Sequence, residues 1–379
     1  MEIQEYLEQG QILMARNKVL DLAYDAEDQR FSEEVNAWCR NLFMHKNEFN
    51  DSVRAEWEAL SNNPPAAFHK SGDTIPADVL MFQQVSKSYP GSNFSISAVN
   101  LTLREGELIG IVGENGNGKT TLLNLAAQCI HPGRGTITYP FLAGIATDRY
   151  SIRQHIGFIP QRIPRWYGSL RESLHFAASC RGIYGRENEV KVEQILHRLD
   201  LWKYNTYNWN SISSGYKTRF ELARILLGRP RLLILDEPLA NLDINTQQLL
   251  LNDLRHLAKS RRHPMAVLMS SQQLHEIEKA SDNIIFLKEG RSIFQSATDK
   301  GTLEGTLLEL DVHPGDQEKL ESWSVPGCIR TYTGSFYLLE MEGSARGDEV
   351  LRSLLGAGIR VVYFRDISLS AKRFFNKRK

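Results

Sequence analysis

The residues most able to do chemistry begin in a glycine-rich loop at 113–121, which reads GENGNGKTT. The loop fits the pattern G-x4-G-K-[ST], with Gly113 as its first glycine and Lys119 before the threonine. Its glycines allow backbone N–H groups to curl around phosphates, and the following helix adds the positive end of its dipole. Lys119 is expected to reach the outer phosphates, and Thr120 to offer its hydroxyl to Mg²⁺. The loop therefore predicts a nucleoside triphosphate site, and its expected binding residues are Gly113, Asn115, Gly116, Asn117, Gly118, Lys119, Thr120 and Thr121.

A second chemical signal is the segment RLLILDEP at 231–238. Four apolar residues predict a buried strand, and Asp236 stands at its end, where a carboxylate can hold Mg²⁺ directly or through water. Glu237 follows at once and is placed to polarise an attacking water. On the same domain as the phosphate loop, this pair predicts hydrolysis of the bound nucleotide.

A third segment leaves two interpretations open. The residues MAVLMSSQQLHE at 265–276 run from an apolar strand through a polar loop into a helix-like stretch. The loop is either an ordinary connection or a catalytic loop in which Gln272 acts on the phosphates. His275 is expected to point outward from the following helix.

The chain divides into three regions that differ in their pattern of apolar, polar and helix-breaking residues. Residues 1–77 are acidic, rich in helix formers and end in a breaker-rich linker, which predicts a helical hairpin or small bundle that is separable from the rest. Residues 78–298 alternate short β-branched runs with helical segments, which indicates a layered α/β domain. Residues 299–379 follow the order β-α-β-β-α-β, which predicts a small α+β, split βαβ-like domain.

Several motifs of the middle region, taken together, resemble the nucleotide-binding subunit of an export-type ABC transporter. In chain order they are VSKSYP, the phosphate loop, IGFIPQ, SISSGYKTRFELARILLGRP, LILDEP and LANLD, which ends at Asp243. The resemblance implies a P-loop NTPase cassette with a helical subdomain. It also implies that Tyr89 stacks on adenine and that Gln161 contacts both Mg²⁺ and the membrane partner.

The same resemblance implies partners. Two cassettes pair head to tail, so that Ser213 and Gly215 bind the γ-phosphate of an ATP held by the other cassette. Because the chain has one cassette, the second comes from another copy or a paralogue. A separate membrane-spanning permease is implied, with its coupling helix docked on the helical subdomain. Trp166 and Tyr167 either take part in that docking or pack inside the subdomain.

Two departures from the family pattern bear on activity. The usual signature Leu-Ser-Gly-Gly-Gln is replaced by Ile-Ser-Ser-Gly-Tyr at 212–216, which keeps the serine and the second glycine but places a Cβ at Ser214. Gln272 stands where the family has a switch histidine. Its amide can still donate a hydrogen bond to a phosphate oxygen but cannot carry charge. We therefore expect an active ATPase.

Composition restricts the class of protein. Acidic and basic residues balance at 45 each, so no overall positive field favours nucleic acid. No apolar run approaches the roughly 18 residues of a membrane span, and the acidic N-terminus does not resemble a signal peptide. Four dispersed cysteines without a CxxC pair are typical of reduced thiols in a cytosolic protein. The expected location is the cytoplasmic face of the cell membrane, reached through the permease.

Two alternative functions remain from the sequence. One is a soluble ABC-type ATPase that acts on ribosomes or DNA. The ribosome-acting ATPases usually fuse two cassettes in one chain. The DNA-repair ATPases insert long coiled coils between the phosphate loop and the signature. This chain has one cassette, and only about ninety residues separate the two motifs, so transport is favoured. The other alternative is a regulatory cassette that binds ATP with little hydrolysis, which the two departures allow.

Overall fold

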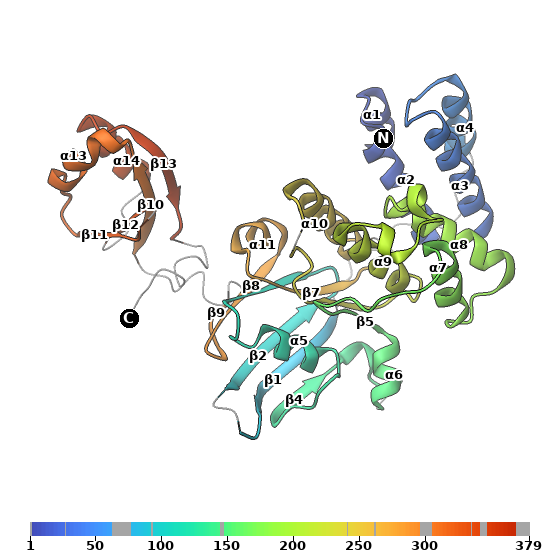
Figure 1. Ribbon diagram of the computed structural model, residues 1–379, viewed down its shortest axis with the longest axis horizontal. Helices are drawn as coiled ribbons and strands as arrows, with labels where there is room; N and C mark the ends of the chain where they lie inside the picture. Colours follow the sequence, from blue (N-terminus) through green and yellow to red (C-terminus); the bar gives the residue numbers. More distant parts are fainter. Residues whose placement is uncertain are drawn as a thin grey trace.

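The computed structural model describes residues 2–26, 28–62, 77–91, 94–144, 148–240, 242–260, 263–295, 305–334, 336–341 and 347–368. Along the chain lie a group of N-terminal helices, a large sheet with helices on its two faces, and a small C-terminal sheet with two helices (Figure 1). The linker at 63–76, the predicted boundary at 298 and the basic residues 369–379 lie outside the described residues.

The large sheet has the strand order β4-β1-β2-β9-β8-β3-β7-β6-β5. Its strands are β1 (Asp78–Ser88), β2 (Ser95–Arg104), β3 (Leu108–Val112), β4 (Arg134–Thr138), β5 (Ile156–Ile159), β6 (Leu232–Leu235), β7 (Ala266–Ser271), β8 (Asn283–Lys288) and β9 (Arg291–Gln295). Strands β8, β3, β7, β6 and β5 run parallel to their neighbours in this order. Their carboxyl ends therefore meet at one edge, and the residues that follow them lie close together.

The apolar strands are buried because helices cover both faces of the sheet. On β6, Leu232 and Ile234 pack in one core cluster, whereas Leu233 and Leu235 pack in the other. The helices that contact the sheet are α5 (Lys119–Ala126), α6 (Arg149–Gln154), α9 (Ser214–Leu226), α10 (Ile244–Ala258) and α11 (Leu274–Ala280). Two further helices, α7 (Leu170–Ser179) and α8 (Gly185–Arg198), pack against α9 and each other. This double burial explains the continuous apolar runs of the sequence, and the predicted layered α/β architecture is confirmed.

The N-terminal helices form a small bundle with its own core. They are α1 (Glu2–Glu8), α2 (Ile12–Ala26), α3 (Gln29–Met44) and α4 (Asp51–Asn62). Trp38 is fully buried in this core, and its ring nitrogen donates to the carbonyl of Val53 on α4, 3.2 Å away. Asp28 caps α3 by accepting from the N–H of Phe31. The predicted all-α extension is confirmed.

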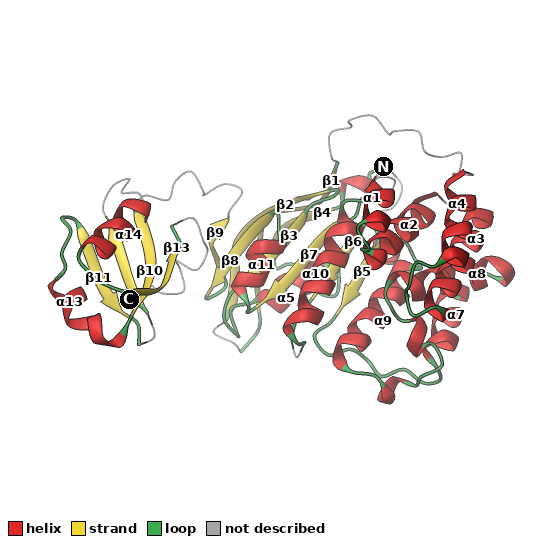
Figure 2. Cartoon of the chain, turned by 90° about the horizontal axis from the view of Figure 1, so that it is seen from above, coloured by secondary structure: helices red, strands yellow, loops and turns green. Residues whose placement is uncertain are grey.

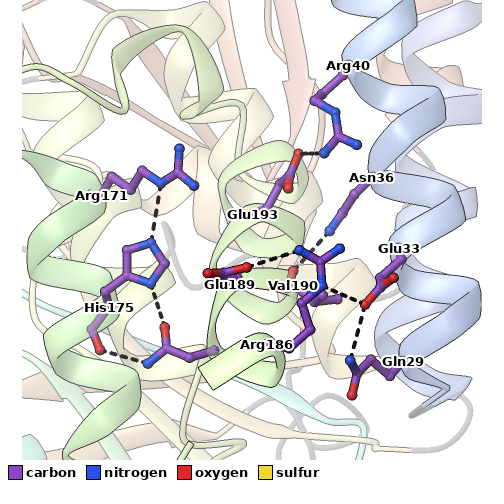
Figure 3. A network of polar contacts seen from close by, with 11 residues as sticks. Gln29, Glu33, Asn36, Arg40, Arg171, His175, Arg186, Glu189, Val190 and Glu193 are labelled. Carbon is purple, nitrogen blue, oxygen red and sulfur yellow. Dashed lines mark hydrogen bonds and ion pairs between the residues drawn. The ribbon is translucent and has the colours of Figure 1, made fainter. Parts of the chain in front are cut away.

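This bundle also packs against the rest of the protein (Figure 3). Asn36, which is buried, donates from Nδ2 to the carbonyl of Val190 on α8 at 3.0 Å. Arg40 pairs with Glu193, one turn further along α8. The expectation of a separable hairpin does not fit these contacts, because a buried amide bonded across the interface cannot be exposed without cost. The sequence pattern showed the amphipathic faces of the bundle but not what lies against them.

The C-terminal part confirms the predicted order of elements. It consists of β10 (Thr306–Val312), α13 (Gln317–Ser322), β11 (Cys328–Tyr332), β12 (Tyr337–Met341), α14 (Gly347–Gly356) and β13 (Val361–Asp366). Its sheet has the order β11-β12-β10-β13, and Leu308 and Leu339 pack beneath the helices with Leu320 and Leu354. Within the described ranges, no helix has the length and apolar character needed to cross a bilayer.

Candidate active site

The phosphate loop connects the end of β3 to the first turn of α5. Gly118 caps α5 in a left-handed conformation with φ 96°, and Gly116 has φ 82°. A Cβ on Gly118 would lie 2.7 Å from the ring of Phe94, so glycine is required there both by backbone geometry and by space. Because α5 begins at Lys119, its free N–H groups face the loop. This arrangement fits an anionic phosphate chain.

Lys119 is buried beside its own loop. Its Nζ donates to the carbonyl oxygens of Gly113 at 2.8 Å and Glu114 at 3.2 Å. The same nitrogen lies 3.2 Å from Oε1 of Glu237, and both side chains are less than a tenth exposed. The cation and the expected water-polarising carboxylate therefore form one buried pair at the edge of the sheet.

Asp236 joins three strands at this edge. Its Oδ2 accepts from the hydroxyl of Thr120 at 2.9 Å, and its Oδ1 accepts from the hydroxyl of Ser270 at 2.7 Å. Its N–H donates to the carbonyl of Ile159 at the end of β5. Two of the three residues expected to hold a metal, Thr120 and Asp236, are thus brought into direct contact, whereas the third, Gln161, is exposed. Hydroxyl and carboxylate oxygens are the donors that Mg²⁺ prefers, so the residues present fit that ion.

Glu237 is held in an unusual backbone conformation. Its φ is 52°, in the left-handed region that costs free energy for a residue with a Cβ. Two contacts hold it there: its N–H donates to Ser270 Oγ at 2.9 Å, and its Oε2 accepts from the N–H of Gln272 at 3.2 Å. The position of this carboxylate is therefore set by β7 and the loop that follows.

Gln272 contacts Glu237 through its backbone, while its side chain is exposed. His275 is exposed on α11, which is the expected outward orientation. Partial burial, followed by the nearby Arg365 and Lys279, lowers the pKa of the His275 imidazole, which favours its neutral form. The loop thus presents an uncharged amide rather than an imidazole beside the site.

Two other predicted residues lie on the surface. Gln161 follows β5 by two residues and is exposed. Tyr89 lies just beyond the end of β1 with 37% of its surface exposed, and the Lys87 ammonium is 5.7 Å from its ring centre. Asn117 of the phosphate loop accepts from the N–H of Glu289, after β8, at 3.0 Å. At the rim of the site, the Tyr89 ring is thus accessible, and a hydrogen bond from the residue after β8 holds the phosphate loop.

The signature residues form a second group with contacts of their own. Ser213 is the exposed N-terminal cap of α9, and Gly215 is buried in its first turn. A Cβ on Gly215 would lie 2.8 Å from Cγ2 of Thr246, near the start of α10. Asp243 caps α10 by accepting from the N–H of Thr246. The start of α9 therefore packs closely on the start of α10.

Sequence reasoning missed Ser270. Its hydroxyl contacts both Asp236 and the N–H of Glu237, and the residue is fully buried. A signal was present, because Ser270 is the first polar residue after the apolar run of a strand predicted to adjoin the Asp-Glu strand.

The sequence left open whether Trp166 and Tyr167 pack inside the helical subdomain or face a partner. Trp166 is partly buried against the main core and donates to Glu221, whereas Tyr167 is 80% exposed.

Comparison with known proteins identifies relatives of the central region. The family described as ABC transporter matches residues 96–240. The "Uncharacterized ABC transporter ATP-binding protein YxlF" of Bacillus subtilis is 30% identical over 249 residues, which cover 65% of this chain and 79% of that relative. The "Phosphonates import ATP-binding protein PhnC" of Treponema denticola is 28% identical over 235 residues, covering 58% of this chain and 90% of PhnC.

Solved structures share the fold of the same region. A dimeric, post-hydrolysis state of an ATP-binding cassette bound to ADP and Pi superposes with a TM-score of 0.51 and 23% identity. The match covers 57% of this chain and 97% of that structure, and at this level of identity it shows the fold alone.

Proposed function

The chain belongs to the family of ABC transporter ATP-binding proteins, and we propose that it hydrolyses ATP to power export through a separate membrane subunit. The fold class and the ATPase assignment are those of the family. The observation that carries the proposal for this chain is the contact set in which Thr120, Asp236 and Ser270 meet beside the Lys119–Glu237 pair. It unites a phosphate-binding cation, a metal-binding oxygen pair and a base at the edge of one sheet.

Each residue has a role that its surroundings support. The loop at 113–121 binds the phosphates, with Lys119 directed at the outer ones, and Tyr89 offers its exposed ring to the adenine. Thr120 and Asp236 would hold Mg²⁺, with Gln161 at the rim, and a bound ion would supply positive charge beside the phosphates. Glu237 orients and polarises the attacking water. Gln272 keeps Glu237 in position through its N–H.

A second cassette completes the site in this proposal. Ser213 and Gly215 bind the γ-phosphate of an ATP held by the other cassette, because α9 directs its free N–H groups and positive dipole end outward beside the exposed Ser213. Ser214, where the family has glycine, is the first residue of α9 and is exposed. The second cassette is a copy of this chain or a paralogue.

The membrane partner is a permease, and it places this chain at the inner face of the cell membrane. Tyr167, exposed on the helical subdomain, supports a contact there. Export is proposed because the segment after Gln161 resembles the helical subdomain of exporter cassettes. PhnC is named as an import protein, so direction needs a transport measurement with the permease.

Dimerisation driven by ATP tests the proposal. In Glu237→Gln, hydrolysis is blocked while binding across two cassettes remains, so light scattering with saturating Mg-ATP should show a dimer. The matched control is Glu237→Gln with Ser213→Arg, whose bulky charged side chain blocks the expected γ-phosphate contact. A monomer in the first protein, with and without a candidate partner, would contradict the head-to-tail arrangement. A dimer that persists in the control would contradict the role of Ser213.

A further inference from the structure

The N-terminal bundle contacts three parts of the cassette: α8, the end of α9 and the residues after α10. In both ribbon views its helices lie beside α8 (Figures 1 and 2). Helix α2 reaches further: the Tyr24 hydroxyl donates to the carbonyl of Leu226 at the end of α9, at 3.1 Å. Arg229 donates back to the carbonyl of Tyr24 at 3.0 Å, and Ser260, after α10, donates to Asp25 at 2.6 Å. The extension therefore spans α8, α9 and α10.

Beneath α2 lies a chain of ion pairs that begins and ends on that helix. Its six side chains alternate in sign. They come from α2, α8, α9, α10 and the short segment that follows α8. In order of contact they are Arg16, Asp200, Arg219, Asp253, Arg198 and Asp21. We call this set the charge ring.

Four members of the charge ring form its most buried part, in which the side chain of Asp253 is 12% exposed and that of Asp21 is 25% exposed. Asp21 Oδ1 lies 2.5 Å from Nε of Arg198, whose Nη1 lies 3.6 Å from Asp253. The other carboxylate oxygen of Asp253 lies 3.6 Å from Nη2 of Arg219. The two arginine side chains are 2% and 8% exposed. Arg198 thus contacts Asp21 and Asp253, and Arg219 contacts Asp253 and Asp200. Of these three carboxylates only Asp21 comes from outside the cassette.

The energetics make Asp21 important. Burial raises the pKa of Asp253 above its usual value and outweighs the opposing charges of Arg198 and Arg219. A buried charge that loses its partner is strongly unfavourable, because the remaining interactions no longer offset its desolvation. Without Asp21, Arg198 would keep only Asp253 among its partners in the charge ring, and Arg219 contacts that carboxylate too.

The charge ring adjoins the signature residues through α9. Arg219 lies one turn after Gly215 on this helix, and Asp253 lies two turns after Thr246 on α10. Gly215 packs on Thr246 with no room for a Cβ. The two helices are therefore fixed to each other at their starts by close packing and further along by the Arg219–Asp253 pair. The Arg219–Asp253 pair therefore bears on how α9 lies against α10.

We propose that Asp21 is a positioning residue: acting through Arg198 and Asp253, it fixes α9 against α10, so the N-terminal extension helps to set where Ser213 and Gly215 lie. This inference rests on the proposed role of Ser213 and Gly215 in hydrolysis. It concerns the rate of the reaction, because the phosphate loop and its contacts with Asp236 lie outside the charge ring.

The direct test is hydrogen exchange on the full-length protein. Asp21→Asn removes the charge without changing the size of the side chain. Exchange of the α9 and α10 amides should rise about tenfold or more, the scale for a lost charged partner, while α5 should be unchanged. The matched control is Glu33→Gln, which removes an ion pair to Arg186 in the same interface. The side chain of Arg186 is 63% exposed. Such exposed pairs contribute little, so the control should match wild type.

Kinetics then separate the inference from the proposed function. Asp21→Asn should lower kcat about tenfold with an unchanged ATP dissociation constant, and Asp21→Glu, which keeps the charge, should recover part of the loss. Exchange changes confined to α1–α4, or equal in Asp21→Asn and Glu33→Gln, would overturn the inference. A wild-type kcat in Asp21→Asn would also overturn the inference, provided that Ser213→Ala has a lower kcat than wild type. If Ser213→Ala also matches wild type, the proposed signature role fails, and the exchange data alone decide the coupling.

Discussion

The hydroxyl of Ser270 lies 2.7 Å from the carboxylate of Asp236 and also accepts the N–H of Glu237 at 2.9 Å. One side chain on β7 thus orients the expected metal-binding carboxylate and holds the strained backbone of the expected base. This arrangement depends on the parallel pairing of β6 with β7, which places both strand ends at one edge.

We expect Ser270→Ala to lower kcat about tenfold, because a small misplacement of both acidic groups is costly for the reaction. ATP binding by the loop at 113–121 should change little. The measurement is steady-state phosphate release beside titration calorimetry. Ser173→Ala, which removes a similarly buried hydroxyl from α7, is the control and should keep the wild-type rate. Equal rates in the two variants would contradict the role of Ser270.

Lys119→Ala should weaken ATP binding about tenfold or more, because a charged donor to the phosphates is lost. It should also reduce the free energy of unfolding by about 3 kcal/mol, because Glu237 is left as a buried carboxylate without its cation. Adding Glu237→Gln should restore part of that stability but not the binding. Denaturant titration and calorimetry on the single and double variants measure both quantities. Unchanged ATP affinity in Lys119→Ala would contradict the assignment of residues 113–121 as the phosphate-binding loop.

Three substitutions separate the backbone of Gln272 from its side chain. Gln272→Ala keeps the N–H that Glu237 accepts, so its rate should fall only about threefold, and Gln272→His should keep or raise the rate. Gln272→Pro removes the N–H and should lower the rate about tenfold or more. Phosphate release with Mg-ATP compares them. A wild-type rate in Gln272→Pro would show that the backbone contact has no role, and a wild-type rate in Gln272→Ala would exclude the side chain.

Tyr89→Ala should weaken ATP about three- to tenfold, the equivalent of a stacking contribution of about 0.5–1.5 kcal/mol. Tyr89→Phe keeps the ring and should bind like wild type. Titration calorimetry with ATP gives both affinities. Equal losses in the two variants would indicate a contact by the hydroxyl instead of stacking.

Gly215→Ala should destabilise the protein by about 1–3 kcal/mol, because its Cβ would lie 2.8 Å from Thr246 and force α9 away from α10. Gly356→Ala is the matched control: this helical glycine, in α14, has no heavy atom within 4 Å of the added Cβ. That change should be neutral or stabilise by up to about 1 kcal/mol. Thermal and denaturant unfolding compare the variants, and a neutral Gly215→Ala would show that the packing there is loose.

Local sequence patterns were enough to predict the main elements and the chemistry of the site. The phosphate loop, the Asp-Glu strand end and the apolar runs of 108–112, 232–235 and 265–269 each have local signatures, because glycine conformation and side-chain periodicity act over a few residues. Since parallel strands place their carboxyl ends together, Lys119, Asp236 and Glu237 could also be assigned to one site.

The tertiary structure alone decided how these residues touch. Ser270 became important only through the register of β7 beside β6, and Gln272 acts on Glu237 by a backbone N–H that no pattern marks. The charge ring joins Asp21 to residues 177 to 232 positions later, and its alternating signs have no periodicity in the chain. Burial turns such distant charges into specific partners, because their interaction is strong only where solvent is excluded, and solvent exclusion is a property of the packed molecule.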